Sequence, residues 1–257
     1  MVYDDNCPLC NAYTKVFVKL GLLNVEGRQA FSQVDAVIMC QIDKHKSRNE
    51  IPLLDTATNQ TWYGLDAMLE VINMKFPLVK KLANIVPVKW VLLRLYKLIS
   101  YNRKVIVAVP KNNSAFDCTP DFNKKYRLFF LLLITSIFYL FIGSAYQFFK
   151  LRILANISET QVYIGFASFL FICWLVPLLV DKSIAYHYWG QIAMLVLVPI
   201  LLLLPLLLLG KILPLTALAK GLYILCVIAF LVKETRRRKV YLMSVIAASK
   251  RPLAQLK

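Results

Sequence analysis

The 257-residue sequence is poor in acidic side chains: 14 aspartates and glutamates stand against 31 lysines and arginines, a formal net charge of +17. After residue 127 only Glu159, Asp181 and Glu234 are acidic. Such a charge can indicate nucleic-acid binding, but no predicted helix or strand carries a basic face with interleaved aromatic residues. The basic residues gather instead beside apolar segments, where they would meet anionic lipid headgroups. We therefore expect membrane lipid, and no nucleic acid, among the partners.

The first residues also lack the features of a secretory signal peptide. The opening "MVYDDNCPLC" has no basic stretch, and it carries two acidic residues where an apolar segment would be needed. We therefore expect that the first domain is not exported.

Long apolar runs are absent from the first half and dominate the second. Four stretches reach the roughly 20 apolar residues that cross a bilayer core: Leu128–Phe149, Tyr163–Val180, Gly190–Leu209 and Ile212–Val232. Basic segments, which favour the cytoplasmic side, precede the first stretch ("NKKYR") and follow the last ("KETRRRK"). An even number of spans places both segments on one side. We therefore expect a multi-pass protein of the bacterial inner membrane with cytoplasmic N- and C-termini.

The first half has the pattern of a small α/β domain. Strand patterns occur at "MVYDD", "RQAFSQV", "EIPLLD" and "QTWYG", and the last two are joined by a turn at "TATN". Helical spacing occurs behind the cysteines, over Ala36–His45, and in "LDAMLEVINMKF", which we expect to stop at Pro77. The order β, α, β, α, β, β, α is typical of the thioredoxin-like fold, a mixed sheet with flanking helices.

Composition divides the chain into four parts. We predict a thioredoxin-like α/β domain at residues 1–110, ending in an amphipathic helix over Lys89–Val107, and a linker at 111–127. An all-α four-helix transmembrane bundle is expected at 128–232, and a basic cytoplasmic tail at 233–257.

Cys7 and Cys10 stand three residues apart, between the first predicted strand and the first predicted helix. A cysteine at a helix N-terminus meets the positive end of the helix dipole, which stabilises the thiolate. We therefore expect Cys7 to be the nucleophile, with a pKa below the roughly 8.5 of free cysteine and with greater exposure than Cys10. Cys10 lies about one turn further along the same face, where it can resolve a mixed disulfide at Cys7.

Together with Asp4, the two cysteines form an Asp-x-x-Cys-x-x-Cys pattern. This pattern, in "VYDDNCPLC", resembles the DCC family of predicted thiol-disulfide oxidoreductases, and "YGLDAMLEVI" and "YKLISYNRKVI" are similar to two further segments of that family. The resemblance covers residues 2–110 and implies a redox-active dithiol. The sequence departs from the family in having Asp5 and Asn6 where a glycine is common.

Asp4 is predicted to be the third catalytic residue. At the end of the first strand, its carboxylate could exchange a proton with Cys10 as that thiol attacks, and the family resemblance supports such a role. Helix capping is the alternative role for an aspartate at this place, although Asp5 and Asn6 are better positioned to cap the helix.

Ile51 and Pro52 stand at the start of the third predicted strand. Thioredoxin-like proteins carry a cis-proline facing the dithiol here, so we expect a cis bond, although only about one X-Pro bond in twenty is cis. Pro52 should then lie against Cys7, and Ile51 would offer its backbone groups to a substrate segment. Both are therefore predicted to be substrate-binding residues.

The other cysteines offer less favoured interpretations. A zinc site at the dithiol would need two more ligands, and Cys40 and His45 would face different sides of one predicted helix, so we expect no metal. Cys118 lies in the linker, where an inert thiol is the usual case. Cys173 and Cys226 lie at matching depths in the second and fourth spans, which makes a transmembrane dithiol geometrically possible.

The sequence thus predicts a membrane-anchored thiol-disulfide oxidoreductase that acts on protein disulfide substrates without a cofactor. In a reducing cytosol the dithiol would act as a reductase, restored by a thiol electron donor. Two alternatives remain open: a transmembrane electron conduit through Cys173 and Cys226, and a non-enzymatic membrane assembly or sensor protein.

Overall fold

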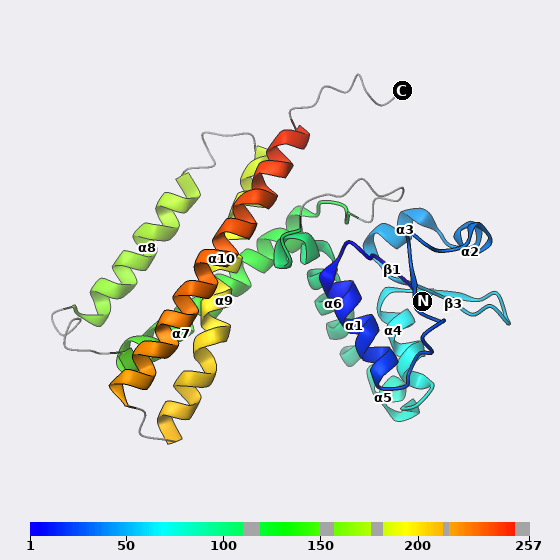
Figure 1. The fold of residues 1–257 in the computed structure, drawn as a ribbon, viewed down its shortest axis with the longest axis horizontal. Helices are drawn as coiled ribbons and strands as arrows, with labels where there is room; N and C mark the ends of the chain where they lie inside the picture. Colours follow the sequence, from blue (N-terminus) through cyan, green and yellow to red (C-terminus); the bar gives the residue numbers. More distant parts are fainter. Residues whose placement is uncertain (110–118, 150–156, 176–181, 213–215, 250–257) are drawn as a thin grey trace. The chain divides into compact units, whose positions relative to one another are not determined.

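The computed structural model describes residues 1–109, 119–149, 157–175, 182–212 and 216–249. The chain forms two compact units, Met1–Arg127 and Leu128–Lys257, and each is described by itself. Figure 1 shows strands in the first unit and long helices in the second.

The first unit begins with a short parallel strand pair joined by a helix. β1 (Val2–Tyr3) leads into α1 (Pro8–Lys19), and β2 (Gln29–Ala30) returns beside β1 with Val2 opposite Gln29. The amino group of Met1 donates a hydrogen bond of 2.7 Å to the carbonyl of Gly27, which extends this pairing. The strand-then-helix order predicted around the dithiol is therefore present.

The helix predicted over Ala36–His45 is broken in two. α2 (Ala36–Gln41) ends before Ile42, which is extended and buried, and α3 (Lys44–Asn49) then begins. Asp43 causes the break, because its Oδ1 accepts the backbone N–H groups of His45 and Lys46 at 2.8 and 3.1 Å and so caps a new helix.

The predicted hairpin is present. β3 (Pro52–Leu54) pairs antiparallel with β4 (Thr61–Tyr63). Asp55 holds the turn by accepting hydrogen bonds from the backbone N–H of Ala57 at 3.0 Å and the hydroxyl of Thr58 at 2.7 Å. This local chemistry made the hairpin predictable.

The single mixed sheet that we expected does not form in the part of the chain that the structure describes. β1 lies beside β3, but the hydrogen-bonded ladders are two separate two-stranded sheets, β1 with β2 and β3 with β4. Strands of two or three residues offer few backbone groups for a wider ladder. Side-chain packing therefore joins the two pairs.

Three helices complete the first unit. α4 (Gly64–Asn73) starts directly after the hairpin, α5 (Pro77–Ala83) begins at the predicted proline, and α6 (Val86–Ile106) covers the predicted amphipathic segment. The buried core includes both Cys7 and Cys10. The dithiol therefore lies within the apolar interior and not on a surface groove.

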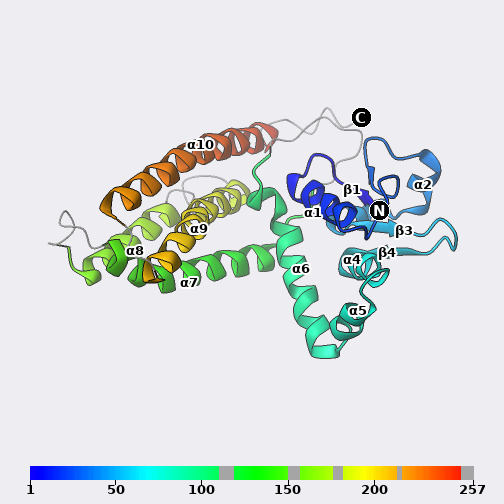
Figure 2. The ribbon, with the colours of Figure 1, turned by 60° about the horizontal axis from the view of Figure 1, so that its bottom comes forward.

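The second unit is helical. Its elements are α7 (Lys124–Phe149), which begins within the first unit, α8 (Glu159–Leu175), α9 (Lys182–Ile212) and α10 (Ala217–Ser249). α9 and α10 pack along one another, as Figures 1 and 2 show. Two segments, Lys124–Gln147 and Ile184–Gly210, are long and apolar enough to cross a membrane, and α8 is a shorter apolar helix.

α10 extends well beyond the span predicted at Ile212–Val232. It continues through the basic segment to Ser249, because lysine and arginine are good helix formers and no proline interrupts this stretch. Arg238, in this segment, is buried and bonds Glu234 and Gln191, both at 2.6 Å. Part of the predicted basic tail is therefore packed protein, while residues 250–257 lie outside the described residues.

Candidate redox site

Cys7 occupies the N-cap position of α1, and three residues, Asp4 to Asn6, separate it from β1. Its backbone N–H donates to the carbonyl of Asp4 at 3.1 Å, and its carbonyl accepts the first helical bond from Asn11 at 3.0 Å. Pro8 follows as the first helical residue, where its missing N–H costs nothing. These contacts hold Cys7 at the N-terminal end of α1, where the first backbone N–H groups have no acceptor within the helix.

The two thiols are electrostatically unequal. The Cys10 thiol donates a hydrogen bond to the Cys7 sulfur, and this bond, opposed by burial, lowers the pKa of Cys7 to about 6. The same bond, together with burial, raises the pKa of Cys10. The predicted direction at Cys7 is therefore found, but its largest cause is the partner thiol and not the helix dipole.

The predicted exposure of Cys7 is wrong. Cys7 is 2% exposed and Cys10 is 3% exposed, so neither sulfur lies open to solvent. Both cysteines belong to the apolar cluster that includes Tyr3, Ile51 and Ala67. An apolar cluster encloses the start of α1 because β1 is short and β3 lies close beside it.

Arg103, near the end of α6, is the residue that the sequence reasoning missed. It is 5% exposed, and its Nη1 lies 3.8 Å from the Cys10 sulfur. Its Nη2 lies 3.8 Å from Oδ2 of Asp4 and donates to the carbonyl of Arg48 at 2.7 Å. One guanidinium therefore contacts two of the three predicted catalytic residues. In the sequence Arg103 is the arginine of "YKLISYNRKVI", a family-like segment that could have indicated its importance, but we predicted no role for it.

Asp4 is buried beside this arginine. Its Oδ1 accepts the N–H of Asn6 at 3.0 Å, and its Oδ2 lies 3.8 Å from Arg103 and 3.9 Å from Lys104. Within the described residues Oδ2 accepts no hydrogen bond. Burial raises the pKa of the Asp4 carboxyl, and Lys104 and Arg103 oppose that effect. Asp4 is thus not a helix cap, since Cys7 holds the cap position without a side-chain bond.

Two tyrosines complete the surroundings of the dithiol. The Tyr13 hydroxyl hydrogen-bonds the Cys10 sulfur, and burial raises the pKa of Tyr13 well above its usual value. The Tyr96 hydroxyl accepts the N–H of Ile51 at 3.2 Å, and burial raises the pKa of Tyr96 to about 12. Both phenols therefore stay neutral and serve as hydrogen-bonding groups.

The cis bond predicted at Pro52 is wrong, because no peptide bond among the described residues is cis. Pro52 is buried and opens β3 in regular pairing with Tyr63. Ile51 uses both backbone groups internally, since its N–H bonds Tyr96 and its carbonyl accepts the N–H of Gly64 at 2.9 Å. A trans bond keeps these hairpin contacts. Ile51 nevertheless packs in the same cluster as the two cysteines.

The remaining cysteines lie away from this site. Cys40 is exposed on α2, and the helix does end between it and His45, yet no group of three or more His, Cys, Asp or Glu residues within the described ranges could hold a metal. Cys173 is buried on α8, and Cys226 is exposed on α10. Cys118 lies outside the described residues.

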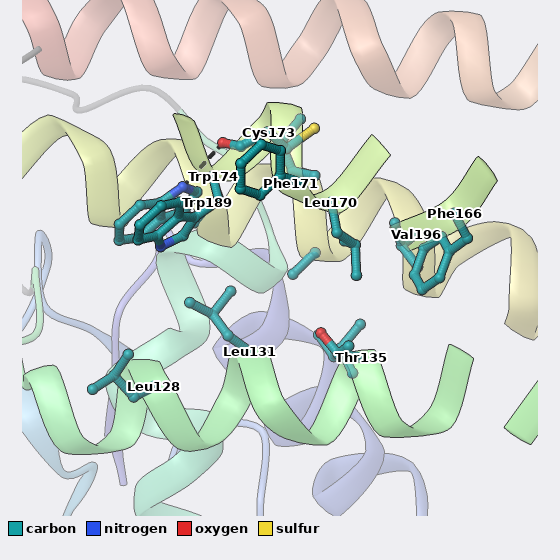
Figure 3. A pocket seen from close by; sticks show the side chains of 13 residues that line it. Leu128, Leu131, Thr135, Phe166, Leu170, Phe171, Cys173, Trp174, Trp189 and Val196 are labelled. Carbon is teal, nitrogen blue, oxygen red and sulfur yellow. Dashed lines mark hydrogen bonds between the residues drawn. The ribbon is translucent and has the colours of Figure 1, made fainter. Parts of the chain in front are cut away.

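A cavity of about 430 Å³ lies within the helical unit. Figure 3 shows its wall, to which α7 contributes Leu128 and Leu131 and α8 contributes Cys173. The indole N–H of Trp189 donates to the carbonyl of Cys173 at 3.1 Å. The lining is apolar and offers no acid or base for catalysis.

In the first unit a strand leads into a helix headed by a buried Cys-x-x-Cys pair, the arrangement expected of a thiol-disulfide redox domain of the α/β class. A family model described as DCC1-like thiol-disulfide oxidoreductase matches residues 1–108, which confirms the resemblance seen in the sequence. Residues 1–108 are thus similar to the DCC1-like family. Neither the curated proteins nor the solved structures contain a match.

Proposed function

We propose that the protein is a membrane-anchored thiol-disulfide oxidoreductase in which Cys7 attacks a protein disulfide and Cys10 resolves the product. The observation that carries the proposal is the unequal pair: the Cys10 thiol donates to Cys7 and holds it as a thiolate near neutral pH. A thiolate is the reactive form in thiol-disulfide exchange.

Exchange takes two displacements. The Cys7 thiolate attacks one sulfur of the substrate disulfide, the substrate bond breaks, and the second substrate sulfur leaves as a thiolate. Cys10 then loses its proton and attacks the Cys7 sulfur, which forms the Cys7–Cys10 disulfide and releases the first substrate sulfur. The substrate gains two electrons, and the dithiol loses them. A thiol donor later restores the dithiol by the reverse steps.

Asp4 and Arg103 serve the second displacement. Once the Cys7 sulfur is bound in the mixed disulfide, Cys10 must itself lose its proton in order to attack. The Cys10 thiolate then needs a stabilising partner other than Cys7. The Arg103 guanidinium lies 3.8 Å from the Cys10 sulfur and can stabilise its developing charge. Asp4, whose pKa is raised by burial, is the acceptor for the proton that leaves Cys10.

Substrate entry requires local opening, because both sulfurs are buried. Ile51 and Pro52 remain the proposed substrate contacts, since Ile51 packs in the cluster around the dithiol. A substrate strand that uses the Ile51 N–H must displace the Tyr96 hydroxyl. Substrate binding is therefore coupled to local opening of the site around the dithiol.

The helical unit is the proposed anchor. Two of its segments have the length and composition of membrane spans, and we propose that α8 and the apolar part of α10 complete four spans with both termini cytoplasmic. In the reducing cytosol this places the dithiol in the role of a reductase. The conduit alternative gains no support, because Cys173 is buried and Cys226 exposed.

A trapping experiment tests the chemistry. In the full-length protein, Cys10→Ser should hold a mixed disulfide at Cys7, and mass spectrometry of the adduct would identify the substrate. Cys7→Ser should trap nothing, and Cys40→Ser, which removes an exposed thiol of the same unit, should behave as wild type. Equal trapping by the Cys7 and Cys10 variants would contradict the assigned order. A Cys173→Ser, Cys226→Ser double variant that stops turnover would favour the conduit.

A further inference from the structure

The helical hairpin α5–α6 exposes an apolar surface that the redox chemistry does not use. Six side chains, together called the α5–α6 patch, share this surface: Leu78, Leu82, Ile85, Val86, Trp90 and Val91. Figure 2 shows α5 and the adjoining end of α6 projecting together from the rest of the first unit. The patch therefore lies at one extremity of that unit.

The exposure of these side chains is unusual in extent. Val86, the first residue of α6, is 81% exposed, and Leu78 and Leu82, four residues apart on α5, are 71% and 62% exposed. Single exposed apolar residues are ordinary, whereas a contiguous apolar patch marks an interaction surface. Within α5 only a small residue, Ala83, is buried.

Positive charge exceeds negative charge around the patch. α5 and α6 contain no aspartate or glutamate, and the acidic residues that reach them from α4 are Glu70, 2.5 Å from Lys80, and Asp66, 2.9 Å from Lys89. Lys81, Arg94 and Lys97 lie on the same two helices as the patch, and the Arg94 guanidinium lies 5.4 Å from the ring of the exposed Trp90. An exposed tryptophan beside lysine and arginine is the composition found at membrane–water interfaces.

We propose that the α5–α6 patch inserts into the interfacial region of an anionic phospholipid bilayer. Its apolar side chains would enter the headgroup–acyl boundary, and the neighbouring cations would meet lipid phosphates. The excess of lysine and arginine on these two helices favours an anionic surface over a second copy of this basic chain. The redox unit thus has a membrane contact of its own, separate from the spans proposed for α7–α10.

The test measures the depth of labelled positions in the full-length protein. A nitroxide is attached to a keto amino acid placed at position 82 or 86, which leaves all native cysteines unlabelled. Positions 25 and 37, where Val25 and Val37 are exposed elsewhere on the first unit, are the matched controls. The protein is reconstituted in vesicles of phosphatidylcholine with one quarter phosphatidylglycerol, and each label is exposed to lipid-soluble oxygen and a water-soluble nickel chelate.

Labels at 82 and 86 should favour oxygen over nickel several-fold more than labels at 25 and 37. If nickel reaches the patch labels as readily as the controls, the patch lies in water and the proposal is wrong. If neither reagent reaches them, the patch is covered by protein, either the helical unit or a second copy, and the proposal is again wrong.

A charge variant tests the lipid class. Lys81→Glu with Lys97→Glu should reduce the oxygen preference at position 86 in the anionic vesicles. Lys15→Glu with Lys19→Glu, on exposed positions of α1, makes the same change in net charge and should leave it unchanged. An equal effect of both double variants would show that only net charge matters and would overturn the assignment to this surface.

Discussion

Two buried arginines, one in each unit, differ in their ionic contacts. Arg238 on α10 makes short bonds, 2.6 Å to Glu234 and 2.6 Å to Gln191, and is 2% exposed. Arg103 on α6 is 5% exposed, yet it lies 3.8 Å from the carboxylate of Asp4 and 3.8 Å from the Cys10 sulfur. Burial of the two side chains is similar, but the geometry of their ionic contacts is not.

The difference separates a structural ion pair from a redox site. Short charge-assisted hydrogen bonds offset much of the free-energy cost of burying an arginine. The charge of Arg238 therefore stabilises the packing of α10 against α9. At Arg103 the short bond goes to the neutral carbonyl of Arg48, and the longer contacts leave the charge shared between a carboxylate and a sulfur. A shared charge can stabilise a thiolate when one develops at Cys10. Four predictions test this contrast.

The largest effect is expected at Arg238. Arg238→Ala removes the buried partner of Glu234 and leaves it only the partly exposed Arg237, and breaking a buried pair costs about 3–5 kcal/mol. Denaturant unfolding of the full-length protein in detergent measures the loss. Replacing both Arg238 and Glu234 with Leu should recover part of it, because no unpaired charge then remains. A double variant less stable than Arg238→Ala would mean that the pair itself stabilises the unit.

A smaller, chemically specific effect is expected at Arg103. Arg103→Gln removes a cation that favours the thiolate at Cys7, so the pKa of Cys7 should rise by about one unit, or roughly tenfold in thiolate fraction below that pKa. The pH dependence of alkylation measures it. Arg103→Lys should restore part of the shift, and Lys104→Gln should change it less. An unchanged profile in Arg103→Gln would show that the guanidinium only fills space.

The pH dependence of stability gives a third test. Folding lowers the pKa of Cys7, so its thiolate stabilises the reduced fold fully above the unfolded pKa of roughly 8.5, and that contribution is lost as the pH falls through about 6. The difference in Tm between wild type and Cys7→Ser should therefore shrink from pH 9 to pH 5. Cys40→Ser is the control for removal of a thiol. A constant difference for Cys7→Ser would contradict a thiolate at this position.

The sequence allowed prediction of the features that depend on near neighbours. Cys7 and Cys10 are three residues apart, and the hairpin turn depends on Asp55 and the residues just after it. Arg103 could not be placed in the same way, because 93 residues separate it from Cys10 and only the packing of α6 brings them together.

The errors at the site have one physical source. Exposure of Cys7 was inferred from its position at a helix N-terminus, and a cis bond at Pro52 from a thioredoxin-like fold with one mixed sheet. The described strands are too short for such a sheet, so Ile51 is tied to Tyr96 and Gly64, and apolar residues close over the dithiol. Predicting this would have required strand lengths, which are set by tertiary packing.

The smallest loss of stability is expected for substitution of Arg237, which precedes Arg238 in the sequence. Its Nη2 lies 2.6 Å from the same Glu234 oxygen that Arg238 contacts, but its side chain is 43% exposed, against 2% for Arg238. Water and salt screen an exposed pair, so Arg237→Ala should cost no more than about 1 kcal/mol. Unfolding at low and high salt separates the two arginines: the Arg237 effect should vanish at high salt, while the Arg238 effect persists. If both substitutions cost the same, bond length and not burial would set the strength of these pairs, and the long contacts of Arg103 would then mark a weak interaction instead of a shared charge.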